Sequence, residues 1–275
     1  MPARYPERIV CLTEESTETL YLLGEERRIV GISGYTVRPA RARREKPRVS
    51  AFLSARTEKI LELKPDLVIG FSDLQADIAR DLTKAGLNVL IFNQRSVQEI
   101  LNMILALSSL VGAAERGSRL VGELEAGLDE IRVSAKRLSR KPRVYFEEWD
   151  EPMISGIRWV SELVEIAGGE DVFSVQSHSQ AASGRIVADP ALVVQKDPEV
   201  IIGSWCGKKF KPERVAARPG WEQITAVREK QLFEVKSADI LQPGPAALTD
   251  GVRQIHEILR RSSGRASETR SRAAG

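Results

Sequence analysis

The chain has 275 residues, of which 42% are hydrophobic and 29% are charged. That length is enough for one large domain or for two lobes of about 100–150 residues, each with its own core. Basic and acidic residues are nearly balanced, 41 against 38, and the +3 net charge is concentrated between Arg260 and Gly275, so the body of the chain gives no electrostatic reason to expect nucleic-acid binding.

The first hundred residues alternate short β-strand patterns with helical patterns. Strands are predicted at 8–12, 29–33, 66–71 and 88–92, and helices at 13–24, near 56–63 and at 74–85. The strand segments are continuous runs of Val, Ile and Leu, which is typical of parallel strands covered on both faces. This part of the chain is therefore predicted to form an α/β lobe.

A wholly helical pattern follows between Ser96 and Ser139. In its second part Leu120, Leu124, Leu128 and Ile131 are separated by four, four and three residues, so they share one helical face. A helix of about 27 residues would be roughly 40 Å long, which is the length of a domain. The pattern predicts a single long connecting helix.

The second half returns to alternating strands and helices. Strands are predicted at 143–149, 199–204 and 232–236, and helices at 160–169, from Asp189 onward and at 246–260. The motif Pro65-Asp66 with Gly70 recurs as Pro198-Glu199 with Gly203, which favours two related lobes. The alternative is that any parallel sheet reuses such a strand entry.

These patterns predict an α/β protein with four parts. They are an N-terminal lobe at 1–110, a connecting helix at 111–140, a C-terminal lobe at 141–261 and a disordered basic tail at 262–275. The tail is expected to be disordered because it has no apolar periodicity to offset its ordering entropy.

The first residues lead directly into a strand, without the basic and apolar regions of a secretory signal. The sequence as written therefore predicts a cytoplasmic protein; the alternative is a periplasmic or cell-surface protein whose signal is missing. No apolar run approaches the about 18 residues of a membrane-spanning helix. Cys11 and Cys206 fall in different halves and predict no disulfide framework.

Common catalytic and cofactor motifs are absent. The chain has no phosphate-binding loop, no three-glycine dinucleotide fingerprint and no nucleophile elbow. It has two histidines, His178 and His256, which argues against an imidazole-based metal site. We expect a binding protein without a resident cofactor rather than an enzyme.

Several segments resemble the vitamin B12-binding branch of the cobalamin/ferric-siderophore ABC-transporter substrate-binding proteins, a family of the helical-backbone metal receptor type. The most specific is FEEWDEPMISGIRWVSELVEIAGGEDVF at 146–173. Further similarity lies in RIVCLTEESTETLYLLG at 8–24, VSAFLSARTEKILELKPDLVIG at 49–70 and QPGPAALTDGVRQIHEIL at 242–259. The likeness covers roughly residues 7–260 and includes no catalytic motif.

The resemblance implies two Rossmann-like lobes joined by one long α-helix, with a ligand cleft between the lobes. It implies a corrinoid ligand such as cobalamin, and an ABC permease as a partner. The alternative within the family is a ferric-siderophore or haem-type iron chelate. The family is usually exported, and here this sequence departs from it. We expect the protein to be a monomer.

Ligands of open α/β sheets bind outside the carboxyl ends of the strands. A corrin is a broad, largely apolar disc with amide side arms, which suits aromatic side chains at those ends. Tyr35 also matches a ligand contact of the family by position. The predicted ligand-binding residues are Thr13, Glu14, Tyr35, Phe52, Phe71, Trp149, Trp205, Asp239 and Gln242.

Each of these residues has a second interpretation. Phe52 and Phe71 are equally consistent with core positions, whereas Trp149 and Trp205 directly follow strands and are expected to contact ligand rather than to pack. His178 is a candidate cobalt ligand, although an exposed loop histidine is the commoner case. Cys206 is expected to pack rather than to bind cobalt.

Charged groups supply the remaining alternatives. The basic loop at 38–48 is either a solvated edge or an attraction for an anionic ligand, and a siderophore site would need Arg38 or Arg185. An enzyme would have to use Glu147, Glu148 and Asp150 as acid–base groups, since adjacent carboxylates raise one another's pKa values.

Overall fold

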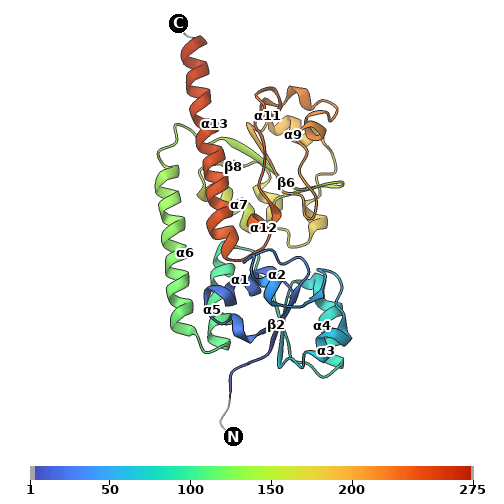
Figure 1. Cartoon of the computed structure of the whole chain (residues 1–275). Helices are drawn as coiled ribbons and strands as arrows, with labels where there is room; N and C mark the ends of the chain where they lie inside the picture. Colours follow the sequence, from blue (N-terminus) through green and yellow to red (C-terminus); the bar gives the residue numbers. More distant parts are fainter. Residues whose placement is uncertain (1–3, 274–275) are drawn as a thin grey trace. The chain divides into compact units, whose positions relative to one another are not determined.

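The structure is a computed structural model that describes residues 4–273 (Figure 1). The chain forms two compact units. The first comprises the chain up to Gln94, Gln98–Leu124 and Pro243–Pro245; the second comprises Arg95–Val97, Glu125–Gln242 and the chain from Ala246 onward.

The first unit is built on a five-stranded parallel sheet. Its strands are β1 (Ile9–Cys11), β2 (Ile29–Ser33), β3 (Arg48–Ser50), β4 (Leu67–Phe71) and β5 (Val89–Phe92). They are ordered β3-β2-β1-β4-β5, and every neighbouring pair is parallel. The order reverses at β1, as in doubly wound sheets, so the carboxyl ends of all five strands share one edge.

Helices lie between these strands and after the last of them. They are α1 (Glu14–Leu22), α2 (Ala42–Glu45), α3 (Thr57–Glu62), α4 (Ala76–Lys84) and α5 (Val97–Leu110), with 3₁₀ turns at Glu26–Arg28 and Asp73–Gln75. Val10, Leu12, Ile60, Val68 and Leu82 form one cluster of the buried core, so strands and helices are held by the predicted apolar runs.

The long helix predicted from apolar spacing is confirmed as α6 (Ala114–Ala135), which continues from the first unit into the second. Leu124, Leu128 and Ile131 are buried along it. It ends at Ala135 rather than near Ser139, where the predicted apolar spacing has already stopped.

The second unit contains a mixed sheet. Its strands are β6 (Arg143–Asp150), β7 (Met153–Ser155), β8 (Glu170–Asp171), β9 (Val200–Gly203) and β10 (Leu232–Glu234). The order is β10-β9-β6-β7, with β8 also on β6. All pairs are parallel except β6 with β7, an antiparallel hairpin turning at Glu151-Pro152 that the sequence patterns did not predict.

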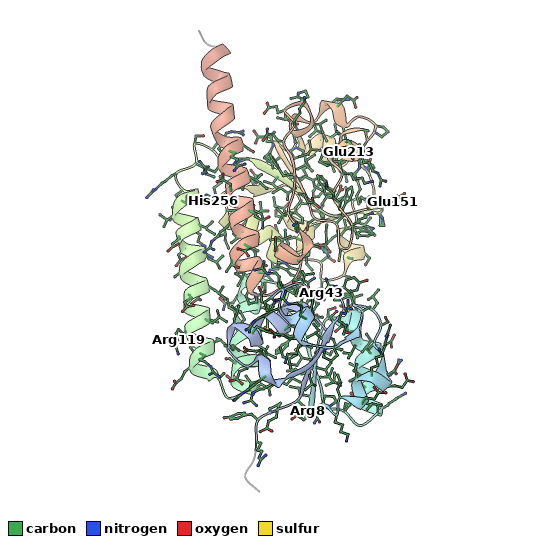
Figure 2. The ribbon with its side chains drawn as sticks, viewed as in Figure 1. Arg8, Arg43, Arg119, Glu151, Glu213 and His256 are labelled. Carbon is green, nitrogen blue, oxygen red and sulfur yellow. The ribbon has the colours of Figure 1, made fainter. Side chains whose placement is uncertain are left out.

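The helices of this unit are mostly short. They are α7 (Arg158–Ile166), α8 (Ser174–Ser177), α9 (Ala191–Lys196), α10 (Pro212–Ala216), α11 (Thr225–Arg228), α12 (Ser237–Ile240) and α13 (Val252–Ala273), with 3₁₀ turns at Ala182–Arg185 and Trp221–Gln223 and a π-helical turn at Ala247–Gly251. In the core the Tyr145 ring meets Phe173 and Trp221 edge-on, with ring centroids 5.4 and 6.0 Å apart. His256 on α13 lies with Nε2 2.8 Å from Ser134 Oγ of α6 (Figure 2).

The C-terminal tail differs from its prediction. It was expected to be disordered from residue 262, but α13 continues to Ala273; residues 274–275 lie outside the described part. The helix starts on buried Val252, Ile255 and Leu259, and once a helix exists each added residue gains a backbone hydrogen bond.

Among the described residues, no helix combines the length and the apolar character needed to span a membrane.

Candidate ligand-binding surfaces

Loops after three strands of the first sheet expose apolar side chains at its carboxyl edge. Tyr35 after β2 is 62% exposed, Leu53 after β3 is 68% exposed and Leu74 after β4 is 59% exposed. Phe52 is half-buried beside Leu53. Exposed apolar groups gathered on the edge where open sheets bind ligands make this the candidate surface of the first unit. The sequence predicts Tyr35 and Phe52 but not the two leucines, because single leucines in loops have no distinguishing spacing.

A buried glutamine fixes this edge. Gln75 Oε1 accepts a 2.9 Å hydrogen bond from Phe71 N–H, and its Nε2 donates at 2.9 Å to the Phe52 carbonyl. Gln75 therefore ties the loop after β3 to the end of β4. A Cβ on Gly70 would lie 2.6 Å from Gln75 Oε1, so any larger residue there would displace the Gln75 side chain. Phe71 itself is only 5% exposed, which places it in the core rather than on the surface.

Thr13 and Glu14, predicted as ligand contacts, are buried and hold local structure instead. Thr13 Oγ1 donates a 2.5 Å hydrogen bond to Glu15, and Glu14 Oε2 accepts one of 2.7 Å from Val37 N–H. Arg38 Nε donates at 2.9 Å to Glu18. Two carboxylates of α1 thus hold the loop that follows Tyr35, and Arg38 is engaged in an ion pair instead of being aimed at a siderophore.

The surroundings of Glu14 and Glu15 raise the pKa values of both carboxyl groups. Burial, reinforced by the nearby charges of Glu18 and Glu15, raises the pKa of Glu14 to about 8, although the Val37 N–H acts in the opposite direction. Burial raises the pKa of Glu15 to about 7, against the hydrogen bond from Thr13. One of the two carboxylates that attach the loop to α1, Glu14, therefore changes charge near neutral pH.

At the carboxyl end of β6 in the second unit, the acids proposed for catalysis are paired with cations. Glu147 is fully buried and accepts hydrogen bonds from Arg218 at 2.5 and 2.9 Å and from Tyr145 Oη at 3.0 Å. Glu148 accepts at 2.5 Å from Arg185, which is itself buried. These pairs stabilise the strand, and they give no support to the enzyme alternative or to a siderophore bound by Arg185.

The position of Trp205 differs from its prediction. It was expected to contact ligand, but it is 3% exposed and packs edge-on against Phe210 with ring centroids 5.0 Å apart. Its Nε1 donates a 3.0 Å hydrogen bond to Glu147. The position after β9 is right for a ligand contact, but the side chain turns into the core, where its indole N–H satisfies a buried carboxylate.

Trp149 remains at the surface of this unit. It is half-buried, and its Nε1 donates a 2.8 Å hydrogen bond to the Glu151 carbonyl. Lys208 Nζ lies 4.1 Å from the centroid of the Trp149 ring and forms an ion pair with Asp150. Lys208 was not predicted from the sequence, because a lysine in a loop after a strand is an ordinary solvated residue.

The remaining predicted residues are spread over the second unit. Asp239 and Gln242 are half-buried, and Asp239 accepts a 3.0 Å hydrogen bond from Gln254. His178 and Cys206 are exposed. Within the described residues no three His, Cys, Asp or Glu side chains are placed to hold a metal ion.

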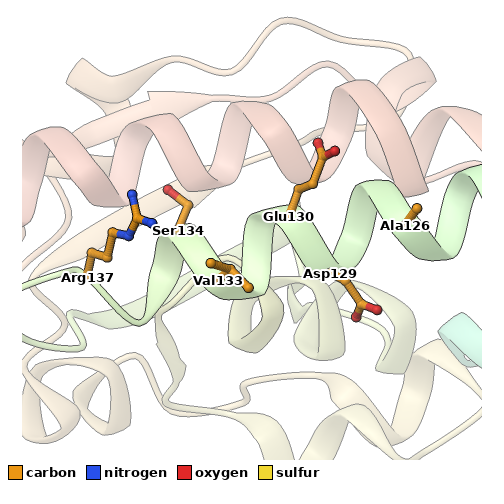
Figure 3. A pocket seen from close by; sticks show the side chains of 6 residues that line it. All are labelled: Ala126, Asp129, Glu130, Val133, Ser134 and Arg137. Atoms are coloured by element: carbon orange, nitrogen blue, oxygen red, sulfur yellow. The ribbon is translucent and has the colours of Figure 1, made fainter.

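Two pockets are found in the described part of the chain. One, of about 550 Å³, runs along α6, where Glu130, Ser134 and Arg137 line it on the side toward α13 (Figure 3). The other, of about 510 Å³, lies in the first unit between Leu22 and the loop at 37–41. None of the predicted corrinoid contacts lines either pocket, but Arg38, the candidate for a siderophore ligand, lines the second.

Known proteins are similar to this chain in sequence and in fold. The sequence profile of the periplasmic binding protein family matches residues 9–238. An uncharacterised ABC transporter substrate-binding lipoprotein of Bacillus subtilis is 25% identical over 92% of this chain and 80% of its own length. The vitamin B12-binding protein of Vibrio cholerae is 27% identical over 92% of this chain and 89% of its own.

A solved structure agrees with the fold. The periplasmic heme-binding protein of Roseiflexus superposes with a TM-score of 0.77 at 23% identity, covering 94% of this chain and 99% of that protein. At that identity the likeness shows the two-lobed α/β fold and nothing about the ligand.

Proposed function

Because the chain belongs to the periplasmic binding protein family, we propose that it is the substrate-binding component of an ABC importer, or a corrinoid scavenger, and that its ligand is a corrinoid such as vitamin B12. An ABC permease is its partner in the first case. A cytoplasmic location, with the periplasm or cell surface as the alternative, stays a prediction of the sequence.

The observation that carries the corrinoid proposal is the exposed apolar surface formed by Tyr35, Phe52, Leu53 and Leu74 at the carboxyl edge of the first sheet. A flat, largely apolar macrocycle removes such side chains from water when it binds. The free energy of binding becomes more favourable in proportion to the apolar area that is covered. This surface has no charged group among its four members, which suits a ring better than a small polar solute.

The surface alone fits any flat macrocycle, so the relatives support the choice among them. The relative named for vitamin B12 is 27% identical over nearly the whole chain, whereas the heme-binding likeness is one of fold. A ferric siderophore is less well supported, because Arg38 and Arg185 are both paired with carboxylates.

Ligand titration tests the proposal. Cyanocobalamin and hydroxocobalamin should raise the melting temperature, because a ligand that binds only the folded state adds RT ln(1 + [L]/Kd), about 2.7 kcal/mol at a hundredfold excess over Kd. Calorimetric titration should give a one-to-one isotherm. Unchanged melting in ~100 μM corrinoid, with a clear response to hemin or to a ferric siderophore, would overturn the corrinoid assignment in favour of that chelate.

A further inference from the structure

Basic side chains pair with the carboxylates at the carboxyl end of β6, and one carboxylate takes two of them. The pairs are Glu147 with Arg218, Glu148 with Arg185, and Asp150 with both Lys208 and Arg214. The side chains of Lys208 and Arg214 are 38% and 57% exposed, whereas those of Arg185 and Arg218 are 3% and 17% exposed. The two cations that share Asp150 are therefore the exposed ones of the four.

Lys208 is held in one place by its neighbours. Its Nζ lies 4.1 Å from the ring centroid of Trp149 and 5.1 Å from that of Trp205, and it is paired with the almost fully buried Asp150. Trp149 is itself fixed by the hydrogen bond to Glu151. An ammonium has three donors, and one carboxylate shared with Arg214 does not use them all. A preorganised donor beside an indole face can receive an acceptor at little entropic cost.

We propose that Lys208 is a specificity-determining residue that binds an anionic group of the ligand, a phosphate or a carboxylate, beside the Trp149 ring. This inference rests on the proposed corrinoid function and specifies which corrinoids are selected. Cobalamins carry a phosphodiester in the arm that holds their nucleotide base, cobyric acid carries a carboxylate, and cobinamide carries neither. Lys208 should therefore favour the first two over cobinamide.

The competing explanation is that Lys208 only neutralises Asp150. In that case its replacement changes stability and affects all corrinoids alike. Lys208→Met keeps the apolar stem against Trp149 and removes the charge, and Lys208→Arg keeps the charge. Lys209→Met is the matched control, because Lys209 is an exposed lysine of the same loop.

The experiment measures Kd by calorimetry for cyanocobalamin, cobyric acid and dicyanocobinamide with the full-length protein and these three variants. Lys208→Met should raise the Kd for cyanocobalamin or for cobyric acid by roughly 10-fold, which is the size of one charge-assisted hydrogen bond at a partly exposed site. A loss for cyanocobalamin identifies phosphate as the group bound, and a loss for cobyric acid identifies carboxylate. The Kd for dicyanocobinamide should change by less than about 2-fold. Lys208→Arg should retain the preference, and added salt should reduce it in the wild type but not in Lys208→Met.

Three results would overturn the proposal. One is that Lys208→Met loses as much affinity for cobinamide as for the other two corrinoids. A second is that Lys209→Met loses as much affinity as Lys208→Met. The third is that Lys208→Met keeps its affinity for every ligand. Wild-type protein that binds none of the three corrinoids would instead refute the proposed function itself, so the two failures are distinguishable.

Discussion

Tyr35 and Trp205 show how two aromatic residues with the same sequence context acquire different roles. Both follow a strand, yet Tyr35 is 62% exposed and Trp205 is 3% exposed. Tyr35→Ala should therefore weaken corrinoid binding by about 5- to 150-fold, or ~1–3 kcal/mol, with little change in melting. Trp205→Ala should lower the free energy of unfolding by about 3–5 kcal/mol, because it leaves a cavity and removes a partner of buried Glu147.

Calorimetry and urea unfolding of both variants check this contrast. Trp159→Ala should behave like Trp205→Ala, since Trp159 is buried and its Nε1 donates at 2.9 Å to the Ile240 carbonyl. Normal stability together with lost binding in Trp205→Ala would restore the assignment made from the sequence.

Glu14 makes stability depend on pH. Its pKa is about 8 in the folded protein and 4.5 as a reference, so between these values the folded state binds more protons than the unfolded state. Stability is then highest below pH 4.5 for this group and falls as pH rises through 8. Glu14→Gln keeps an acceptor for Val37 N–H and cannot ionise, so its unfolding free energy should fall less than that of wild type between pH 5 and about 8.

Urea unfolding at several pH values between those limits measures the difference. Glu7→Gln serves as the control, because Glu7 is exposed. Parallel pH profiles for wild type and Glu14→Gln would show that Glu14 is ionised in the folded protein throughout.

At the scale of elements, the sequence predicts helices and strands that have a long apolar pattern and misses several strands of two or three residues. Most of the parallel strands were predicted because continuous Val, Ile and Leu runs such as 67–69 are long enough to be distinguished, and α6 because its apolar face recurs over about three turns. The parallel strands β3 and β8, of three and two residues, were missed. The β7 hairpin was missed because it has three residues and no Asn-Gly or Asp-Gly turn. The helical end of α13 was missed because a helix continued from a packed start needs no apolar face of its own.

Two glycines test how tightly these elements meet. At Gly70 in β4 a Cβ would lie 2.6 Å from Gln75 Oε1 and 2.7 Å from Ile91, whereas at Gly122 in α6 it would meet nothing within 4 Å. Gly70→Ala should destabilise the protein by about 1–3 kcal/mol through overpacking and loosen the loop at Phe52. Gly122→Ala should stabilise it by up to ~1 kcal/mol through helix propensity. Thermal unfolding measures both, and a stable Gly70→Ala protein would mean that Gln75 can move aside without cost.

At the scale of the whole molecule, the fold was more predictable than the site. The spacing of apolar residues along the chain reflects which positions are buried. That spacing can be read from the sequence, and it predicted two α/β lobes and a long helix. Whether a residue at a strand end turns outward, like Tyr35, or inward, like Trp205, depends on partners far along the chain such as Glu147 and Phe210. Lys208 shows the same limit, because its role depends on Asp150 and Trp149, more than fifty residues away.

The path of the chain leads to a prediction for the unfolding of the whole protein. The chain passes between the two units five times, and the short return Pro243–Pro245 belongs to the first unit although it lies near the C-terminal end. Gln94 Nε2 donates at 2.9 Å to the Pro243 carbonyl, and a Cβ on Gly244 would lie 2.5 Å from Glu15 Cβ, so the return is closely packed. Neither unit is a single uninterrupted segment, so neither can form from one continuous stretch of the chain. We therefore expect one cooperative transition in scanning calorimetry, with equal calorimetric and van't Hoff enthalpies, and we expect a bound corrinoid to shift that whole transition. Two transitions, of which the ligand moves only one, would show that the units unfold independently despite the interleaved chain.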